Sequence, residues 1–261
     1  PYVLSVRSAE HYAIGHVPGA ANIAWRAEAD EAALDALPTE QDIIVYCYTG
    51  HTGAVATAII NAMGYPSVNM KYGITAWTRD ADIRVASPFN EETSSDFPVV
   101  TEVPTEMTYD LPTLDVTDSE DDDEILRAAA KTYLDAGTPP TITAEDLFDL
   151  LNDGDETNDP FIISVRGPTD YAAGHIAGAI NIPWKTIAQV ENLQRIPADQ
   201  DIVVYCYTGH SGGLATTVLN ALGYNAQNMR FGMVAWTKDA DIRATSAFDD
   251  AVDANDYPTE P

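Results

Sequence analysis

Most of this chain consists of two similar sequence copies, separated by a constant offset. The heptapeptide Val-Tyr-Cys-Tyr-Thr-Gly-His occupies positions 45–51 and recurs at positions 204–210, an offset of 159 positions. Ser5-Val6-Arg7 recurs as Ser164-Val165-Arg166 at the same offset. This period is much longer than that of solenoid repeats, so we expect each copy to fold as a domain of its own.

The repeat divides the chain into two domains and a linker. We predict a first domain over residues 1–98, a linker over 99–140 and a second domain over 141–261. The linker contains an acidic run, 119–124, that is expected to cap a helix at about 125–136. A lead-in helix at about 143–151 is expected before the second copy. The first copy lacks this lead-in, because Pro1 already stands at its first strand.

Short apolar runs alternate with helical patterns inside each copy. Tyr2–Val6 and Ile43–Tyr46 are typical of buried strands, and Ala54–Met63 has apolar residues at helical spacing before Gly64. The second copy repeats these runs at Phe161–Val165, Ile202–Tyr205 and Leu214–Leu222. The alternation predicts an α/β fold in which each domain is a parallel sheet flanked by helices.

Composition excludes several classes of function. The 261 residues include 41 acidic and 13 basic ones, a formal net charge of −28 that would repel a phosphate backbone, so nucleic acid is not an expected partner. No apolar run is long enough to span a membrane. The acidity is typical of a protein soluble in high salt or secreted into a harsh medium. An extracytoplasmic location, periplasmic or secreted, and the cytoplasm of a halophile both stay open.

The only two cysteines, Cys47 and Cys206, each stand where a buried strand ends and a helix is about to begin. Ligands bind at this edge of α/β sheets, and the N–H groups of a helix start favour an anion. The small residues Thr49-Gly50 and Thr208-Gly209 let the loop curl so that several N–H groups face the sulfur. We therefore expect accessible, reactive thiolates. The alternative is a buried cysteine that packs as a small hydrophobe.

Further motifs follow in the same order in both copies. The first copy carries Gly15-His16-Val17-Pro18-Gly19-Ala20-Ala21-Asn22-Ile23, Asp42–Gly50, and Tyr72-Gly73 with Ala76-Trp77; the second carries Gly174–Pro183, Cys206, and Gly232 with Ala235-Trp236. In these motifs each copy resembles a rhodanese-like domain, over nearly all of its length. The chain is thus similar to two such domains in tandem.

The resemblance implies a sulfurtransferase. A cysteine of this family takes a sulfane sulfur from a donor, becomes a persulfide and passes the outer sulfur to a thiol or to cyanide. The catalytic residues would be Cys47 and Cys206. Substrate would be bound by the loop residues Tyr48, Thr49, Gly50, His51 and Thr52 in the first copy and Tyr207, Thr208, Gly209, His210 and Ser211 in the second. No metal or organic cofactor is implied, and the partner is a small donor, a thiol or cyanide acceptor, or another protein.

Loop length separates this family from its phosphatase relatives, which close a longer loop with an arginine six residues after the cysteine. Gly53 and Gly212 stand at those positions, so the loops resemble the sulfurtransferase type. Two-domain thiosulfate enzymes usually keep the cysteine only in the second domain, whereas both copies have it here. The loops also carry no lysine or arginine. Thiosulfate, polysulfide and a protein persulfide all stay open as donors.

Charged side chains flank each cysteine loop. Lys71 and Arg230 stand just before Tyr72-Gly73 and Phe231-Gly232, where a cation could recruit an anionic donor or simply be solvated. His51 and His210 could add positive charge and move a proton, or could hydrogen-bond the rim of the loop.

Other residues depart from the family pattern or support it. His11 and Asp170 stand where thiosulfate enzymes place an arginine. Arg7 and Arg166 are expected to pair with carboxylates inside their domains. The acidic stretch 152–159 has oxygen side chains at alternating positions but lacks the glycine and glutamate of an EF-hand, and we interpret it as an acidic turn without metal.

Two functions of other classes remain as alternatives. The chain could be a sulfur carrier or sensor that loads sulfur without turnover. It could also be a structural or extracellular assembly protein that has retained the fold, in which case both cysteines would be buried and unreactive.

Overall fold

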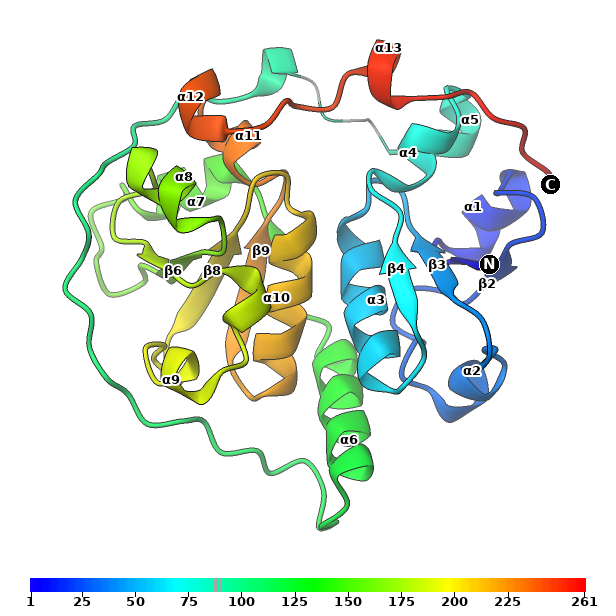
Figure 1. Cartoon of the computed structure of the whole chain (residues 1–261), viewed down its shortest axis with the longest axis horizontal. Coiled ribbons are helices and arrows are strands. Elements are labelled where there is room, and N and C mark those ends of the chain that lie inside the picture. Colours follow the sequence, from blue (N-terminus) through cyan, green and yellow to red (C-terminus); the bar gives the residue numbers. More distant parts are fainter. Residues whose placement is uncertain (87–88, 90) are drawn as a thin grey trace. The chain divides into compact units, whose positions relative to one another are not determined.

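A computed structural model describes residues 1–86, 89 and 91–261. The chain forms two units, each assembled from segments distant in sequence (Figure 1). Unit 1 comprises 1–89, 116–138 and 248–261, and unit 2 comprises 90–115 and 139–247, apart from the residues outside the described ranges. Both are α/β with a parallel sheet flanked by helices, which confirms the predicted fold class.

The sheet of unit 1 has the strand order β2-β1-β3-β4. Its strands are β1 (Tyr2–Ser5), β2 (Ala21–Asn22), β3 (Ile43–Tyr46) and β4 (Ser67–Asn69), and every pair runs parallel. Leu4 pairs with Val45 at the centre, and both side chains are fully buried. Because helices cover both faces of a parallel sheet, its central strands are apolar almost throughout.

Seven helices accompany this sheet among the described residues: α1 (Ala9–Ile14), α2 (Glu31–Asp35), α3 (His51–Ala62), α4 (Gly73–Trp77), α5 (Ala81–Arg84), α6 (Asp122–Asp135) and α13 (Asp250–Asp253). The helix α3 packs on β3 and β4. Ala130 and Leu134 of α6 pack against Val55 and Ile59 of α3. The carboxylate of Asp121 accepts hydrogen bonds from the amides of Asp123 and Glu124 and so caps α6.

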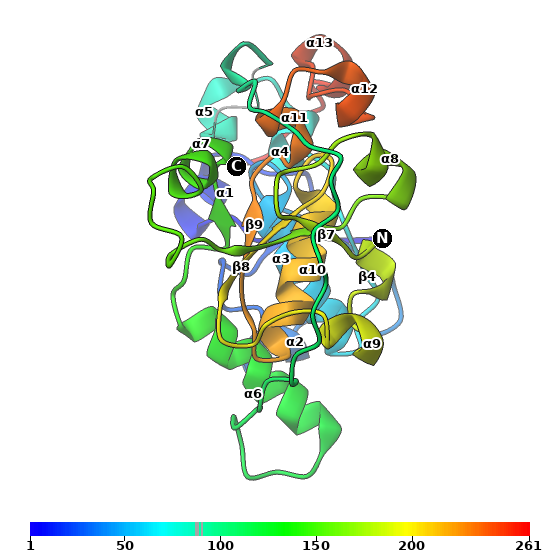
Figure 2. The same ribbon diagram turned by 90° about the vertical axis from the view of Figure 1, so that its left-hand side faces the viewer.

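Unit 2 repeats the arrangement with one more strand, in the order β5-β9-β8-β6-β7. The strands are β5 (Thr141–Ile142), β6 (Phe161–Ser164), β7 (Ile180–Asn181), β8 (Asp201–Tyr205) and β9 (Asn225–Met229), all parallel to their neighbours. The helices are α7 (Ala144–Leu150), α8 (Pro168–Ala173), α9 (Val190–Leu193), α10 (His210–Ala221), α11 (Met233–Trp236) and α12 (Ala240–Arg243), with short 3-10 turns η1 (Glu91–Thr93) and η2 (Trp184–Thr186). The helix α10 packs on β8 and β9, as α3 does in unit 1. Figure 2 shows strands β8 and β9 next to helix α10.

One prediction about the core is wrong. Arg7 and Arg166 are fully buried, but their guanidinium groups bind backbone carbonyls instead of carboxylates. Arg7 donates to the oxygens of Gly15 (2.7 Å) and Ile83 (2.6 Å), and Arg166 makes the equivalent pair of bonds. Burial lowers the pKa of Arg7. The sequence could not show this, because the acceptors are main-chain atoms of two turns that only the fold brings together.

Within the described ranges, no helix combines the length and the apolar character that crossing a bilayer would need.

Candidate active site

Each cysteine lies at the junction of a central strand and the long helix that follows it. Cys47 comes directly after β3, and α3 begins four residues later at His51. The loop closes on itself, because the amide of Gly50 donates a hydrogen bond to Cys47 Sγ at 3.1 Å. Gly50 has φ 90°, a left-handed conformation that glycine adopts without strain. The second copy is the same, with Gly209 N at 3.1 Å from Cys206 Sγ.

The sulfurs are buried, whereas accessible thiolates were expected. Both cysteines are only 1% exposed, because Cys47 packs with Val45 and Ala56, and Cys206 packs with Val204 and Ala215. The amides of Gly50 and Gly209 donate to the sulfurs of Cys47 and Cys206. The sulfur thus sits at the inner end of its loop, with the glycine amide directed at it.

An asparagine from the neighbouring strand donates a hydrogen bond to the backbone of each cysteine loop. The amide of Asn69, the last residue of β4, donates to the Gly50 carbonyl at 2.9 Å, and Asn228 of β9 donates to the Gly209 carbonyl at 2.7 Å. A Cβ atom on Gly53 would lie 2.6 Å from Asn69 Oδ1, closer than van der Waals contact permits. A side chain at this position would require Asn69 or the loop to shift, which favours the glycine that the sequence carries there.

The first residues of a short helix, α4 in unit 1 and α11 in unit 2, donate hydrogen bonds to the backbone of the loop. In unit 1 the amide of Ile74 donates to the Cys47 carbonyl (2.9 Å), and Thr75 donates to the Tyr48 carbonyl through its amide (3.2 Å) and its hydroxyl (2.8 Å). A Cβ atom on Gly73 would collide with the Cys47 carbonyl. In unit 2 the amides of Met233 and Val234 bind the carbonyls of Cys206 and Tyr207 in the same way, at 2.9 and 3.1 Å. The start of α4 and of α11 thus fixes the backbone at each cysteine.

The tyrosine after each cysteine is anchored differently in the two copies. The hydroxyl of Tyr48 lies 2.5 Å from His11 Nδ1, and the Arg7 guanidinium lies 5.2 Å from the centre of its ring. The hydroxyl of Tyr207 instead donates to the carboxylate of Asp170. Burial, and then this carboxylate, raise the pKa of Tyr207. Sequence analysis singled out both partners as departures from the family but did not predict their contact with the tyrosine.

The loop histidines bind the loop itself. Nδ1 of His51 lies 2.9 Å from Thr49 Oγ1, and Nδ1 of His210 lies 2.9 Å from Thr208 Oγ1. His51 is buried, whereas His210 is partly exposed. Thr52 and Ser211, the remaining predicted loop residues, lie in the first turns of α3 and α10.

The two predicted cations lie on a strained turn next to the loop. The ammonium of Lys71 lies 4.6 Å from the centre of the Tyr72 ring, and the guanidinium of Arg230 lies 4.8 Å from that of Phe231. Both aromatic residues adopt positive φ values, 64° and 61°, which are costly for side chains of this size. The strain recurs at the same place in both copies, immediately before the glycine that touches the cysteine carbonyl.

The comparison with protein families agrees with this geometry. The model of the rhodanese-like domain matches residues 1–80 and 143–239, once over each copy. The chain belongs to the rhodanese-like domain family. Both matches include the cysteine loop and its supporting helix, and both end before the segments 91–100 and 250–260.

Individual relatives are similar to one copy or to part of the chain. The chain is 32% identical over 124 residues to a probable adenylyltransferase/sulfurtransferase MoeZ of Mycobacterium tuberculosis, an alignment covering 47% of this chain and 31% of that protein. It is 33% identical over 98 residues to a sulfurtransferase of Allochromatium vinosum, covering 37% of this chain and 87% of that protein. A crystal structure of a rhodanese-like domain protein from Staphylococcus aureus is 28% identical, with a TM-score of 0.34, and covers 38% of this chain and 91% of that one. The chain thus spans less than a third of the length of MoeZ.

Within the described ranges, no cluster of three or more His, Cys, Asp or Glu side chains is arranged to hold a metal ion.

Proposed function

We propose that this protein is a sulfurtransferase with two reaction sites, in which Cys47 and Cys206 carry the sulfur as persulfides. The observation that carries the proposal is the amide of the loop glycine directed at each sulfur, at 3.1 Å in both copies. An N–H group in this position stabilises negative charge on sulfur, both in the free thiolate and in the persulfide. Membership of the rhodanese-like family supports the same chemistry.

The reaction takes place in two displacements. The thiolate of Cys47 attacks the outer sulfur of the donor, a new S–S bond forms, and the donor's own bond to that sulfur breaks with its electron pair leaving on the donor. An acceptor thiolate or cyanide then attacks the outer sulfur of the persulfide, and the electron pair of the S–S bond returns to the cysteine. Each displacement conserves electrons, so neither needs an oxidant or a cofactor.

The donor we propose is a polysulfide or a protein-borne persulfide. Neither loop carries a lysine or arginine that could pair with the sulfonate oxygens of thiosulfate, a group that polysulfides and persulfides lack. Substrate would contact the loop residues 48–52 and 207–211. Lys71 and Arg230 would supply cationic charge for an anionic donor.

The burial of the sulfurs favours a second candidate, a structural protein that has retained the fold. Only 1% of either cysteine is exposed, so a donor has little direct access to the sulfur. The two candidates differ in a simple way. In a sulfurtransferase, both cysteines can be alkylated and loaded with sulfur while the protein is folded. In a structural protein, the cysteines react only after unfolding.

Steady-state kinetics with polysulfide as donor and cyanide as acceptor test the proposal. We expect ping-pong kinetics, with roughly half of the turnover lost in Cys47→Ser or in Cys206→Ser and all of it lost in the double variant. Turnover that survives in the double variant would contradict the assignment. Loading without transfer would indicate a sulfur carrier, and thiols that react only in denaturant would indicate the structural protein.

A further inference from the structure

A short motif outside the family match follows each copy. Asp96-Phe97-Pro98 comes after the first copy, and Asp256-Tyr257-Pro258 comes after the second. An acidic residue precedes each motif, Glu91 in the first case and Asp250 in the second. We name residues 91–100 the first strap and residues 250–260 the second strap.

Each strap belongs to the unit formed by the other copy. The first strap follows the first copy in sequence but lies in unit 2 with residues 139–247. The second strap follows the second copy but lies in unit 1, with residues 1–89. The two copies have therefore exchanged equivalent segments.

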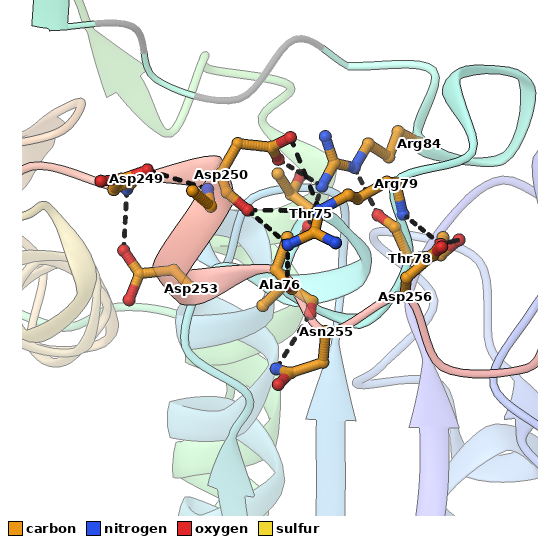
Figure 3. A network of polar contacts seen from close by, with 12 residues as sticks. Thr75, Ala76, Thr78, Arg79, Arg84, Asp249, Asp250, Asp253, Asn255 and Asp256 are labelled. Atoms are coloured by element: carbon orange, nitrogen blue, oxygen red, sulfur yellow. Dashed lines mark hydrogen bonds and ion pairs between the residues drawn. The ribbon is translucent and has the colours of Figure 1, made fainter.

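The second strap runs along the end of α4 in unit 1 (Figure 3). The carboxylate of Asp256 accepts a hydrogen bond from the amide of Arg79 at 3.1 Å. The amide of Tyr257 donates to the Trp77 carbonyl (2.7 Å), and the Trp77 indole N–H donates back to the Pro258 carbonyl (2.8 Å). The amide of Asn255 donates to the Ala76 carbonyl at 3.0 Å.

The first strap makes the same contacts at the end of α11 in unit 2. Asp96 accepts from the amide of Lys238 at 3.1 Å, and this bond together with that of Thr237 lowers the pKa of Asp96. The amide of Phe97 donates to the Trp236 carbonyl (2.9 Å), and the Trp236 indole donates to the Pro98 carbonyl (2.9 Å). The match is atom for atom at the aspartate, the aromatic residue and the proline.

An ion pair and a β-bridge anchor the two ends of each strap. Arg84 pairs with Asp250 at 2.6 Å in unit 1, and Arg243 pairs with Glu91 at 2.6 Å in unit 2. Both arginines are buried, so the pairs are shielded from solvent on one side. At the other end an antiparallel bridge joins His16 to Glu260 in unit 1 and Val100 to His175 in unit 2.

The strap is connected to the cysteine through one short helix. In unit 1 the start of α4 binds the carbonyls of Cys47 and Tyr48, and the end of α4 binds the second strap at Ala76 and Trp77. This helix has only five residues, so a shift of its last turn moves the donors that hold the cysteine. α11 makes the same connection in unit 2.

We propose that each strap is a positioning element for the cysteine loop of the other copy. Reactivity at Cys47 then depends on the second strap, and reactivity at Cys206 depends on the first strap. Because of the exchange, the site in each copy depends on the strap that follows the other copy in the sequence. The catalytic meaning of this dependence rests on the proposed sulfur transfer, but the effect on the two thiols does not.

A matched pair of variants in the full-length protein tests the dependence. Asp256→Ala removes the acceptor of the Arg79 amide, and Asp96→Ala removes that of the Lys238 amide. We expect Asp256→Ala to change the rate of iodoacetamide alkylation at Cys47 by about threefold to tenfold, the scale of one or two hydrogen bonds, and to leave Cys206 unchanged. Asp96→Ala should change the alkylation rate of Cys206 by a similar factor and leave that of Cys47 unchanged. Rates are measured for each cysteine by peptide mass spectrometry over a range of pH, so that a shift of the pH profile separates a changed thiol from a loss of folded protein.

Two further variants keep the test decisive. Asp256→Asn retains the accepting oxygen and should restore the rate at Cys47. Trp77→Phe removes the indole donor to Pro258 while keeping an aromatic ring against Tyr257, and should act on Cys47 in the same direction as Asp256→Ala, even if the latter folds poorly. An effect of Asp256→Ala on Cys206, an equal effect on both cysteines, or no effect would overturn the proposal. Absence of persulfide in the wild type would instead refute sulfur transfer, and the alkylation pattern would still decide the role of the straps.

Discussion

Glu28 is a buried carboxyl group in unit 1 that the proposed reaction does not use. The amide of Arg26 donates to its Oε2 at 2.7 Å, while Oε1 has no hydrogen-bond partner. Burial raises the pKa of Glu28 to about 8. At the equivalent place in the second copy the chain carries Ile187, which is part of the hydrophobic core. The first copy therefore carries an ionisable group at a position that the fold fills with a hydrocarbon.

This difference predicts that Glu28→Ile stabilises the protein at alkaline pH. The folded state holds the proton up to pH of about 8, whereas the unfolded chain releases it near 4.5, so the free energy of unfolding falls as the pH rises through that window. Replacing Glu28 should remove this fall, which amounts to about 5 kcal/mol above pH 8. Thermal melts of the two proteins across the window check it. Equal pH dependence would contradict the burial, and Ile187→Glu should introduce the same fall in unit 2.

Individual site residues were predictable from the sequence to the extent that they are local. The cysteines and the loop residues share one short stretch, and its recurrence singles them out as candidates from the sequence alone. Asn69 and Asn228 also recur at the same offset, yet their role was missed, because they reach the loop from the next strand. The same reason hid the partners of Tyr48 and Tyr207, which come from α1 and α8.

The cysteine loop is the element on which the site depends, and its packing against Asn69 gives a second prediction. Gly53→Ala would place a Cβ atom 2.6 Å from Asn69 Oδ1, so either the loop or the asparagine must shift. We expect unit 1 to lose about 1–3 kcal/mol of stability and the alkylation rate of Cys47 to change, with Cys206 unaffected. Combining Gly53→Ala with Asn69→Ala should recover part of the stability but not the rate, because the Gly50 carbonyl has lost its donor. Simple additivity of the two substitutions would contradict this contact.

Strands and helices were predicted well where apolar periodicity reaches their ends. Ile43–Tyr46 is a strand with the predicted bounds, and Tyr2–Ser5 is one residue shorter than predicted. The helix expected at Ala54–Met63 begins three residues earlier, at His51, because its first turn is made by the cysteine loop and shows no apolar pattern. Short strands such as β2 and β5 have too few residues for any periodicity and were not predicted.

At the scale of the whole molecule, the excess of acidic residues predicts a stability that depends on salt. A formal charge of −28 makes the compact state repel itself, and salt screens this repulsion over distances of about 10 Å at 0.1 M. We expect the melting temperature to rise with sodium chloride. Sodium chloride and sodium sulfate compared at equal ionic strength separate this screening from a general strengthening of hydrophobic burial. A melting temperature independent of sodium chloride would contradict it.

The exchange of the straps is the feature of the whole molecule that sequence analysis did not predict. The repeat showed that two copies exist. From the repeat alone, each strap would be expected to pack on the copy that it follows in the sequence. The Asp-aromatic-Pro motif recurs at an offset one residue longer than the rest, so it lies outside the register that revealed the duplication. Only the fold shows which copy each strap contacts.

The central claim is that both sulfurs accept a further sulfur while the protein is folded. Peptide mass spectrometry after brief exposure of the native protein to polysulfide measures this directly at each cysteine. The account predicts one added sulfur on Cys47 and one on Cys206, both removed by cyanide. Cysteines that stay unmodified in the native protein but gain sulfur once it is denatured would contradict it.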